Sequence, residues 1–141
     1  MRMKEDAMKN GPLKPAYNVQ HGVDAEYISW LTVGLQPTDT TTLIPFLKSM
    51  EQNLNFKYLN IVADAGYESE ENYSFIEDNN QIAFIKPSNY EISKTRKYKN
   101  NIGRIENMDY DAEKDLFICQ NGKTLKVYGM KFKKSKTGYK T

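Results

Sequence analysis

One aspartate, Asp64, has the residue type and the position that metal-dependent chemistry requires. It directly follows the apolar run 58–63 and precedes Ala65 and Gly66. In open α/β sheets, ligands gather at the carboxyl ends of the strands. A carboxylate beside a small, flexible glycine can point into a cleft there and bind Mg²⁺, which takes one or two protein carboxylates together with phosphate oxygens. The alternative is that Asp64 only caps a turn or the helix that follows.

The other polar residues of interest have simpler structural interpretations. Asp39 precedes an expected helix, and we expect it to cap that helix. Asp24 lies where a hairpin turns, and His21 continues one face of a strand, so both are interpreted as structural. Cys119 lies in an apolar run and is predicted to be a small core residue. The acidic cluster 106–115 lacks the spacing of a calcium-binding loop and is predicted to be a solvated loop.

Charge is unevenly distributed along the chain. Its 141 residues carry 20 Lys and Arg against 18 Asp and Glu, a net charge of +2. Residues 123–141 hold seven Lys and no acid, so the rest of the chain has 13 basic and 18 acidic residues, a net charge of −5. The stretch 86–104 is also basic, and tyrosines are interleaved with both basic stretches. This composition suits a polyanion such as DNA; the alternative is an ordinary solvated surface.

Composition excludes several classes of protein. One cysteine cannot form a disulfide within the chain, and one histidine excludes a site that needs two imidazoles from the same chain. No apolar run approaches the roughly 18 residues that a membrane helix requires. Residues 1–6 lack the apolar segment of a secretory signal. We therefore expect about one domain, in a reducing, cytoplasmic setting and without a membrane partner.

Hydrophobic periodicity predicts the elements of the first half. Period-two alternation predicts a β-hairpin over roughly 15–23 and 27–35. A helix is predicted to start at Thr41 or Thr42, where polar caps precede apolar residues at helical spacing. The run 58–63, which ends at Asp64, predicts a strand buried on both faces, as in a parallel pair.

The pattern continues to a second strand and a second hairpin. Ser69, followed by two glutamates, predicts a helix start, and the run 81–86 predicts another buried strand. Segments 116–118 and 125–128, joined across an Asn-Gly pair, predict a hairpin. A hairpin that leads into a β-α-β unit predicts a mixed sheet with helices packed on it.

Several segments resemble bacterial insertion-sequence transposases of the DDE type. The most specific segment is 61–67, with the sequence Ile-Val-Ala-Asp-Ala-Gly-Tyr, followed by 69–73. The resemblance covers nearly the whole chain, and its other segments are 1–6, 8–11, 13–20, 37–40, 43–47 and 121–123.

The resemblance implies a ribonuclease H-like catalytic core, in which three acids hold two Mg²⁺ ions for DNA strand cleavage and strand transfer. The second acid of this family follows the fourth strand, and Asp64 matches it. Asp64 is therefore the predicted catalytic residue and metal ligand, Mg²⁺ the cofactor and DNA the partner, with a homo-oligomer left open. We expect a partial ribonuclease H-like core over 1–87 and an extension of basic and acidic segments with a hairpin over 88–141.

The chain also departs from the family pattern. The first acid lies on a strand upstream of a segment like 1–6, and the third, a glutamate, lies on a helix after the basic region. No residue of this chain is assigned to either role. Without the first strand, two half-sheets with unpaired edges are expected. We therefore predict a central fragment of a DDE transposase that does not cut DNA alone, because one carboxylate cannot build a two-metal site.

Two alternatives to this reading of the chain are left open. The first is a non-catalytic remnant that binds nucleic acid through the basic segments 86–104 and 123–141, with salt-sensitive, sequence-independent affinity. Its candidate DNA contacts are Lys86, Arg96, Lys97, Lys133 and Lys134. The second is a decayed reading frame with no selected role.

Overall fold

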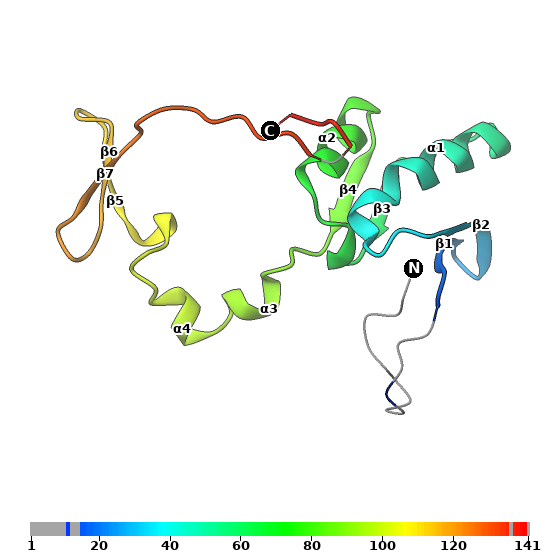
Figure 1. Ribbon diagram of the computed structural model, residues 1–141, viewed down its shortest axis with the longest axis horizontal. Helices are drawn as coiled ribbons and strands as arrows, with labels where there is room; N and C mark the ends of the chain where they lie inside the picture. The colour runs from blue at the N-terminus through cyan, green and yellow to red at the C-terminus, as the bar shows by residue number, and fades with distance from the viewer. Residues whose placement is uncertain (1–10, 12–14, 136, 141) are drawn as a thin grey trace. The chain divides into compact units, whose positions relative to one another are not determined.

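The computed structural model describes Gly11 and residues 15–135 and 137–140. The chain divides into two compact units, unit 1 over Met1–Pro87 and unit 2 over Ser88–Thr141 (Figure 1). The elements of unit 1 are β1 (Asn18–Asp24), β2 (Tyr27–Gly34), the 3₁₀ helix η1 (Asp39–Thr41), α1 (Leu43–Leu54), β3 (Asn60–Ala63), the 3₁₀ helix η2 (Ala65–Tyr67), α2 (Glu70–Asp78) and β4 (Ile82–Ile85). Those of unit 2 are α3 (Tyr90–Ser93), α4 (Arg96–Lys99), the 3₁₀ helix η3 (Ile105–Asn107), β5 (Asp109–Asp111), β6 (Leu116–Ile118) and β7 (Thr124–Lys126).

A hairpin with a register shift between Gly22 and Val23 lies in the first part of unit 1. Strands β1 and β2 pair antiparallel along their whole length, which confirms the predicted hairpin. Ala25 takes a positive φ of 53° in the turn between them. Gly22 lets the hairpin approach α1 closely, because a Cβ at this position would lie 2.9 Å from Cζ of Phe46.

Helix α1 supplies most of the core of unit 1. It begins directly after Thr42, as predicted, and Pro45 lies in its first turn, where a missing N–H breaks no helical hydrogen bond. Apolar residues recur along one face at helical spacing and are buried. They are Leu43, Phe46, Leu47 and Met50, and they pack against Ile61, Ile76 and Ile85.

Strands β3 and β4 pair in parallel and are connected through α2, as predicted. Helix α2 begins where expected, since Ser69 Oγ accepts a hydrogen bond from the backbone N–H of Asn72 at 3.1 Å. The expectation that both strands are buried on both faces is wrong. One face packs into the core, whereas on the other face Val62 is 79% exposed and Phe84 is 54% exposed.

The described strands form three separate sheets, with strand orders β1-β2, β3-β4 and β5-β6-β7. The chain is therefore mixed α/β, but the single mixed sheet predicted from the order of elements is not formed by the residues described. The reason is that no strand among the described residues of unit 1 connects β1 to β3, so these residues form two separate half-sheets. The ribonuclease H-like arrangement of these strands stays a prediction.

Unit 2 is built around a three-stranded antiparallel sheet. The predicted hairpin of β6 and β7 is confirmed, with Gly122 at a positive φ of 78° in its turn. The prediction of a solvated acidic loop over 106–115 is wrong in part, because β5 lies within it and pairs with β6. Asp111 Oδ1 accepts hydrogen bonds from two backbone N–H groups and so fixes the β5–β6 turn. Cys119 is buried at the end of β6, as expected.

Two further expectations concern the first residues and the membrane. The polar composition of 1–12, with Gly11 and Pro12, predicts a loop, and this segment lies, apart from Gly11, outside the described residues. In the part of the chain that the structure describes, no helix has the length and the hydropathy to cross a bilayer.

Candidate functional site

Asp64 lies immediately after the carboxyl end of β3, where the sequence predicts it. Its backbone is extended, with φ of −78° and ψ of 177°, because the strand geometry continues up to η2. Asp64 Oδ1 accepts a hydrogen bond from the N–H of Gly66 at 2.7 Å, so the turn-capping alternative is realised by this oxygen. The residue is exposed, and among the described residues Oδ2 has no hydrogen-bond partner. One carboxylate oxygen thus holds the turn, in a residue that is exposed as a whole.

A second carboxylate, that of Asp39, also lies close to Gly66. A Cβ built on Gly66 would lie 3.0 Å from Asp64 Oδ1 and 3.1 Å from Asp39 Oδ2. The prediction that Asp39 caps a helix is wrong, because its side chain makes no cap hydrogen bond to η1 or α1. A larger residue at this position would press on both side chains, so glycine lets the two acids approach the same point.

Two amides on β1 orient the Asp39 side chain. Asp39 Oδ1 accepts hydrogen bonds from Nδ2 of Asn18 at 2.7 Å and from Nε2 of Gln20 at 3.2 Å. Gln20 Nε2 also contacts Oδ1 of Asn18, and its Oε1 accepts a hydrogen bond from the hydroxyl of Tyr67. This network of Asn18, Gln20, Asp39 and Tyr67 is called the amide network below. It connects β1 to the turn that carries Asp64.

Asn72 holds together the two turns that carry the acids. It is 1% exposed, and its Nδ2 donates to the carbonyl of Thr40 at 3.1 Å and to the carbonyl of Tyr67 at 2.7 Å. Thr40 follows Asp39 directly, and Tyr67 lies three residues after Asp64. A buried side chain of α2 therefore fixes the spacing of both carboxylates.

The electrostatics of this cluster are visible in Tyr67. Burial of its ring raises the pKa of Tyr67 above the ordinary value of 10.0, and the negative charges of Asp39 and Asp64 raise it further. Tyr67 therefore keeps its proton and donates to Gln20 at neutral pH. Both carboxylates act on the same hydroxyl, which agrees with their shared proximity to Gly66.

The donor set is suited to a hard divalent cation but is not a complete site. Mg²⁺ prefers carboxylate oxygens and commonly takes one or two of them from the protein. Asp39 and Asp64 provide such oxygens, whereas the described residues contain no group of three or more His, Cys, Asp or Glu side chains that could hold a metal ion. The cluster can therefore contribute two carboxylates to a shared site.

Sequence reasoning missed Asn18, Gln20 and Asp39 as functional candidates. Asn18 and Gln20 lie two residues apart on one face of a strand, and amides at that spacing are a signal of a polar network where that face is covered. Their partner Asp39 lies 21 residues after Asn18 and 19 residues after Gln20, so this pairing has no local signature in the sequence.

The predicted DNA contacts are all exposed and are distributed over both units. Lys86 follows β4 in unit 1. In unit 2, Arg96 and Lys97 are adjacent on α4. Lys133 and Lys134 are adjacent in an extended segment. There the backbone of Lys134 forms an isolated antiparallel β-bridge with that of Lys140.

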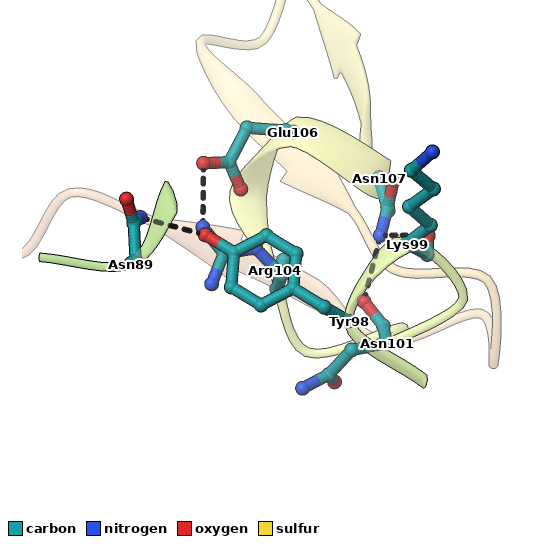
Figure 2. A network of polar contacts seen from close by, with 7 residues as sticks. All are labelled: Asn89, Tyr98, Lys99, Asn101, Arg104, Glu106 and Asn107. Carbon is teal, nitrogen blue, oxygen red and sulfur yellow. Dashed lines mark hydrogen bonds and ion pairs between the residues drawn. The ribbon is translucent and has the colours of Figure 1, made fainter. Parts of the chain in front are cut away.

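A polar network orders the segment around α4 (Figure 2). Asn89 Nδ2 donates to the hydroxyl of Tyr98 at 2.9 Å. The Arg104 guanidinium lies 3.6 Å from the centre of the Tyr98 ring and 2.9 Å from Oε1 of Glu106. Arg104, although it belongs to the basic stretch 86–104, is therefore engaged within the protein.

The chain matches the family described as Transposase DDE domain over residues 2–136. The match covers nearly the whole chain and includes both carboxylates and all five predicted DNA contacts. The chain belongs to this family of DNA-transposition proteins, which confirms the resemblance seen in the sequence. No curated protein and no solved structure matches it.

Proposed function

We propose that this chain contributes Asp64 to the metal-dependent centre of a DDE transposase, which cleaves DNA strands and transfers them during transposition of an insertion sequence. The observation that supports the proposal most is that two carboxylates lie close to Gly66, after the carboxyl end of β3, in a chain of the DDE domain family.

Each residue of the cluster has a distinct part in this proposal. Mg²⁺, when bound, activates the attacking oxygen and stabilises the charge that develops on the phosphate. Asp64 would hold the ion, and its Oδ1 also accepts the hydrogen bond from the N–H of Gly66 that fixes the turn. Asp39 adds a second negative charge beside it, with Oδ1 fixed by Asn18 and Gln20. Tyr67 stays protonated and keeps Gln20 in place.

Metal binding is tested with Mn²⁺ as a paramagnetic probe of the full chain. Substoichiometric Mn²⁺ is expected to broaden the amide signals of Gly66 and Tyr67, and Asp64→Asn is expected to remove that broadening. Asp109→Asn, which deletes an acid in unit 2, is the matched control and should leave it unchanged. Equal broadening in the wild type and in Asp64→Asn would contradict the assignment.

We also propose that the chain alone does not cut DNA, because two-metal phosphoryl transfer needs more acids than the described cluster contains. Purified protein is expected to leave supercoiled DNA intact in Mg²⁺ and in Mn²⁺. Clear nicking that Asp64→Asn abolishes would show that the centre is complete and that this part of the proposal is wrong.

A second candidate function is nucleic-acid binding through the basic segments, favoured by the exposed, adjacent Arg96 and Lys97 on α4. Arg96→Gln/Lys97→Gln is expected to weaken binding to random-sequence duplex DNA and to reduce the slope of affinity against salt. Lys48→Gln/Lys57→Gln removes the same charge from unit 1 and is the control. Equal losses in both double variants would show an effect of net charge alone.

A further inference from the structure

The three-stranded sheet of unit 2 (Figure 1) carries a row of large apolar side chains on one face. Tyr110 of β5 pairs with Phe117 of β6, and Phe117 pairs with Leu125 of β7. Residues that are paired across neighbouring strands lie on the same side of a sheet, so these three side chains form one row across all three strands. The row is called the Tyr110–Leu125 row below.

Both ends of this row are open to solvent. Tyr110 is 54% exposed and Leu125 is 49% exposed, while Phe117 is half-buried between them. The hydroxyl of Tyr110 donates a hydrogen bond to Oδ1 of Asp115 at 2.6 Å, and the ring centres of Tyr110 and Phe117 are 4.9 Å apart. The Tyr110 ring is thus held in place by its hydroxyl and by its neighbour, so a ligand that stacks on it does not have to order it first.

The same face is covered beyond Phe117. Cys119 follows Phe117 by two residues and therefore lies on the same side. It is buried, and its Sγ donates to the carbonyl of Ile102 at 3.2 Å. The segment before η3 therefore closes the face at Cys119, whereas Tyr110 and Leu125 stay exposed.

The charge of unit 2 complements a polyanion. Unit 2 holds 13 Lys and Arg against 6 Asp and Glu, a net charge of +7, whereas unit 1 holds 7 against 12, a net charge of −5. The carbonyl of Lys123 accepts a hydrogen bond from the N–H of Cys119 at 2.8 Å, which extends the ladder of β6 and β7 by one residue. By strand alternation Lys123 lies on the same side as Leu125, and it is exposed. A basic side chain therefore borders the row at β7.

The acids beside the row are used to hold the turn between β5 and β6. Asp115 accepts the hydrogen bond from Tyr110. Asp111 accepts backbone hydrogen bonds in the turn, and its Oδ2 lies 3.7 Å from Nζ of Lys114. A polyanion is therefore expected to run along the basic side of the sheet, at β7, and not over this turn.

Two other tyrosines of unit 2 are less suited to stacking. Lys94 Nζ lies 3.8 Å from the centre of the Tyr90 ring, and the Arg104 guanidinium lies 3.6 Å from that of Tyr98. One face of each ring is therefore engaged by a cation of the chain itself. The Tyr110–Leu125 row instead places two aromatic rings and an aliphatic side chain next to one another on a single surface.

We propose that the Tyr110–Leu125 row binds single-stranded DNA, with unpaired bases stacked on the ring of Tyr110 and packed along Phe117 and Leu125, and with the phosphates toward Lys123. Aromatic side chains on a sheet surface with a positive border are suited to unpaired bases, because every base has a flat π-face. A duplex hides these faces within its own stack. The inference rests on the second candidate function, nucleic-acid binding by unit 2, and it holds whether or not Asp64 binds a metal.

The proposal is tested by comparing two labelled strands of about twelve nucleotides, a length within the range that such surfaces bind. One is oligo-dT, and the other is an abasic strand of the same length, which has the same phosphates and no bases. The full chain is expected to bind oligo-dT about tenfold more tightly than the abasic strand, the value of about one stacked base. Affinity for both is measured by fluorescence anisotropy at the same salt concentration, because the phosphate contribution depends on salt.

Tyr110→Val removes the ring and keeps a β-branched residue that suits a strand. It is expected to remove most of the preference for oligo-dT, while affinity for the abasic strand changes by less than about twofold. Tyr110→Phe keeps the ring and should keep the preference. Tyr27→Val, the same substitution at an exposed strand position of unit 1, is the matched control and should behave like the wild type.

The unaltered protein gives a second readout by NMR. The ring protons of Tyr110 should shift upfield on addition of oligo-dT and should not shift with the abasic strand, because only bases stack on the ring. Equal affinity for the two strands would overturn the proposal, and so would equal losses in Tyr110→Val and Tyr27→Val.

Further outcomes separate this proposal from the function on which it rests. If both strands and a duplex bind equally well and Arg96→Gln/Lys97→Gln weakens all of them, the second candidate function stands and the role of the row is wrong. Binding of none of the three would contradict both. A wild-type dimer that Tyr110→Val dissociates would show that a second copy of the chain covers the row instead.

Discussion

The hydroxyl of Tyr67 donates a hydrogen bond to Oε1 of Gln20, although the two residues are 47 positions apart in the sequence. This bond connects the turn after β3 to the hairpin, and it fixes the amide network in one arrangement. Gln20 is 6% exposed and uses its Nε2 on Asp39. The position of the Asp39 carboxylate therefore depends on the protonation of Tyr67, which lies beside Asp64.

Asp39→Asn is expected to lower the pKa of Tyr67 toward its ordinary value, because it removes one of the two negative charges that oppose ionisation. Burial and Asp64 remain, so part of the elevation persists. The tyrosinate absorbance of each protein is measured against pH, with Tyr67→Phe subtracted to isolate this residue from the ten tyrosines present. An unchanged pKa in Asp39→Asn would contradict the positions of the acids.

The same elevated pKa makes the stability of unit 1 depend on pH. A raised pKa in the folded state means that the contribution of Tyr67 is fully present below the ordinary tyrosine pKa of about 10 and is lost as pH rises through the folded value. Stability measured by urea unfolding should therefore fall more steeply above this pH in the wild type than in Tyr67→Phe. Identical profiles would contradict the raised pKa.

Local signals in the sequence predicted the elements well. Three features are each encoded within a few residues and are found in the structure. They are the helix cap at Ser69, the Asn-Gly turn before Lys123 and the period-two hairpin. The position of Asp64 after β3 was also visible, because an apolar run ends there. These features need no knowledge of what lies elsewhere in the chain.

Features that depend on distant partners were not predictable. Asp39 has the sequence context of a helix cap, but Asn18 and Gln20 compete for its side chain across the fold. The apolar run 58–63 was expected to be covered on both sides, yet burial is a property of the neighbours and not of the run itself. Val62 is exposed because, within the described chain, only the opposite face of its sheet packs against the core.

Gly66→Ala is expected to separate the two carboxylates, since the new methyl would lie 3.0 Å from Asp64 Oδ1 and 3.1 Å from Asp39 Oδ2. The backbone of Gly66 is not in the left-handed region, so the effect is steric and local. We expect weaker Mn²⁺ broadening at Tyr67 and a smaller elevation of its pKa. Gly129→Ala is the control, because a Cβ there meets nothing within 4 Å. The idea fails if both variants behave like the wild type.

Asn72→Ala is expected to destabilise unit 1 by about 2–4 kcal/mol, because it removes the donor to two partly buried carbonyls and opens a small cavity. Trp30 is the one tryptophan of the chain and packs against the core of unit 1, so its fluorescence reports unfolding of that unit in urea. Glu77→Ala, on the exposed side of the same helix, should change stability by less than about 0.5 kcal/mol. Similar losses in both variants would show that Asn72 has no special role.

Arg104→Gln is expected to raise the pKa of Glu106 toward its ordinary value. The pKa of Glu106 is lowered first by a hydrogen bond from its own backbone N–H and next by Arg104, which lies 2.9 Å from Oε1. The backbone contribution remains in the variant, so the rise is partial. It is measured from the carboxyl carbon shift of Glu106 against pH.

The direction in which pH changes the order of the segment around α4 follows from the same pair, Arg104 and Glu106. A lowered pKa in the folded state stabilises the segment above the unfolded pKa of Glu106, and this contribution is lost as pH falls through the folded value. The segment around α4 should therefore loosen in acid sooner in Arg104→Gln than in the wild type. Lys94→Gln, which removes a comparable ion pair with Glu91 and a contact with the Tyr90 ring, is the control. If Lys94→Gln raises the pKa of Glu106 as far as Arg104→Gln does, the specific pairing of Arg104 with Glu106 is wrong.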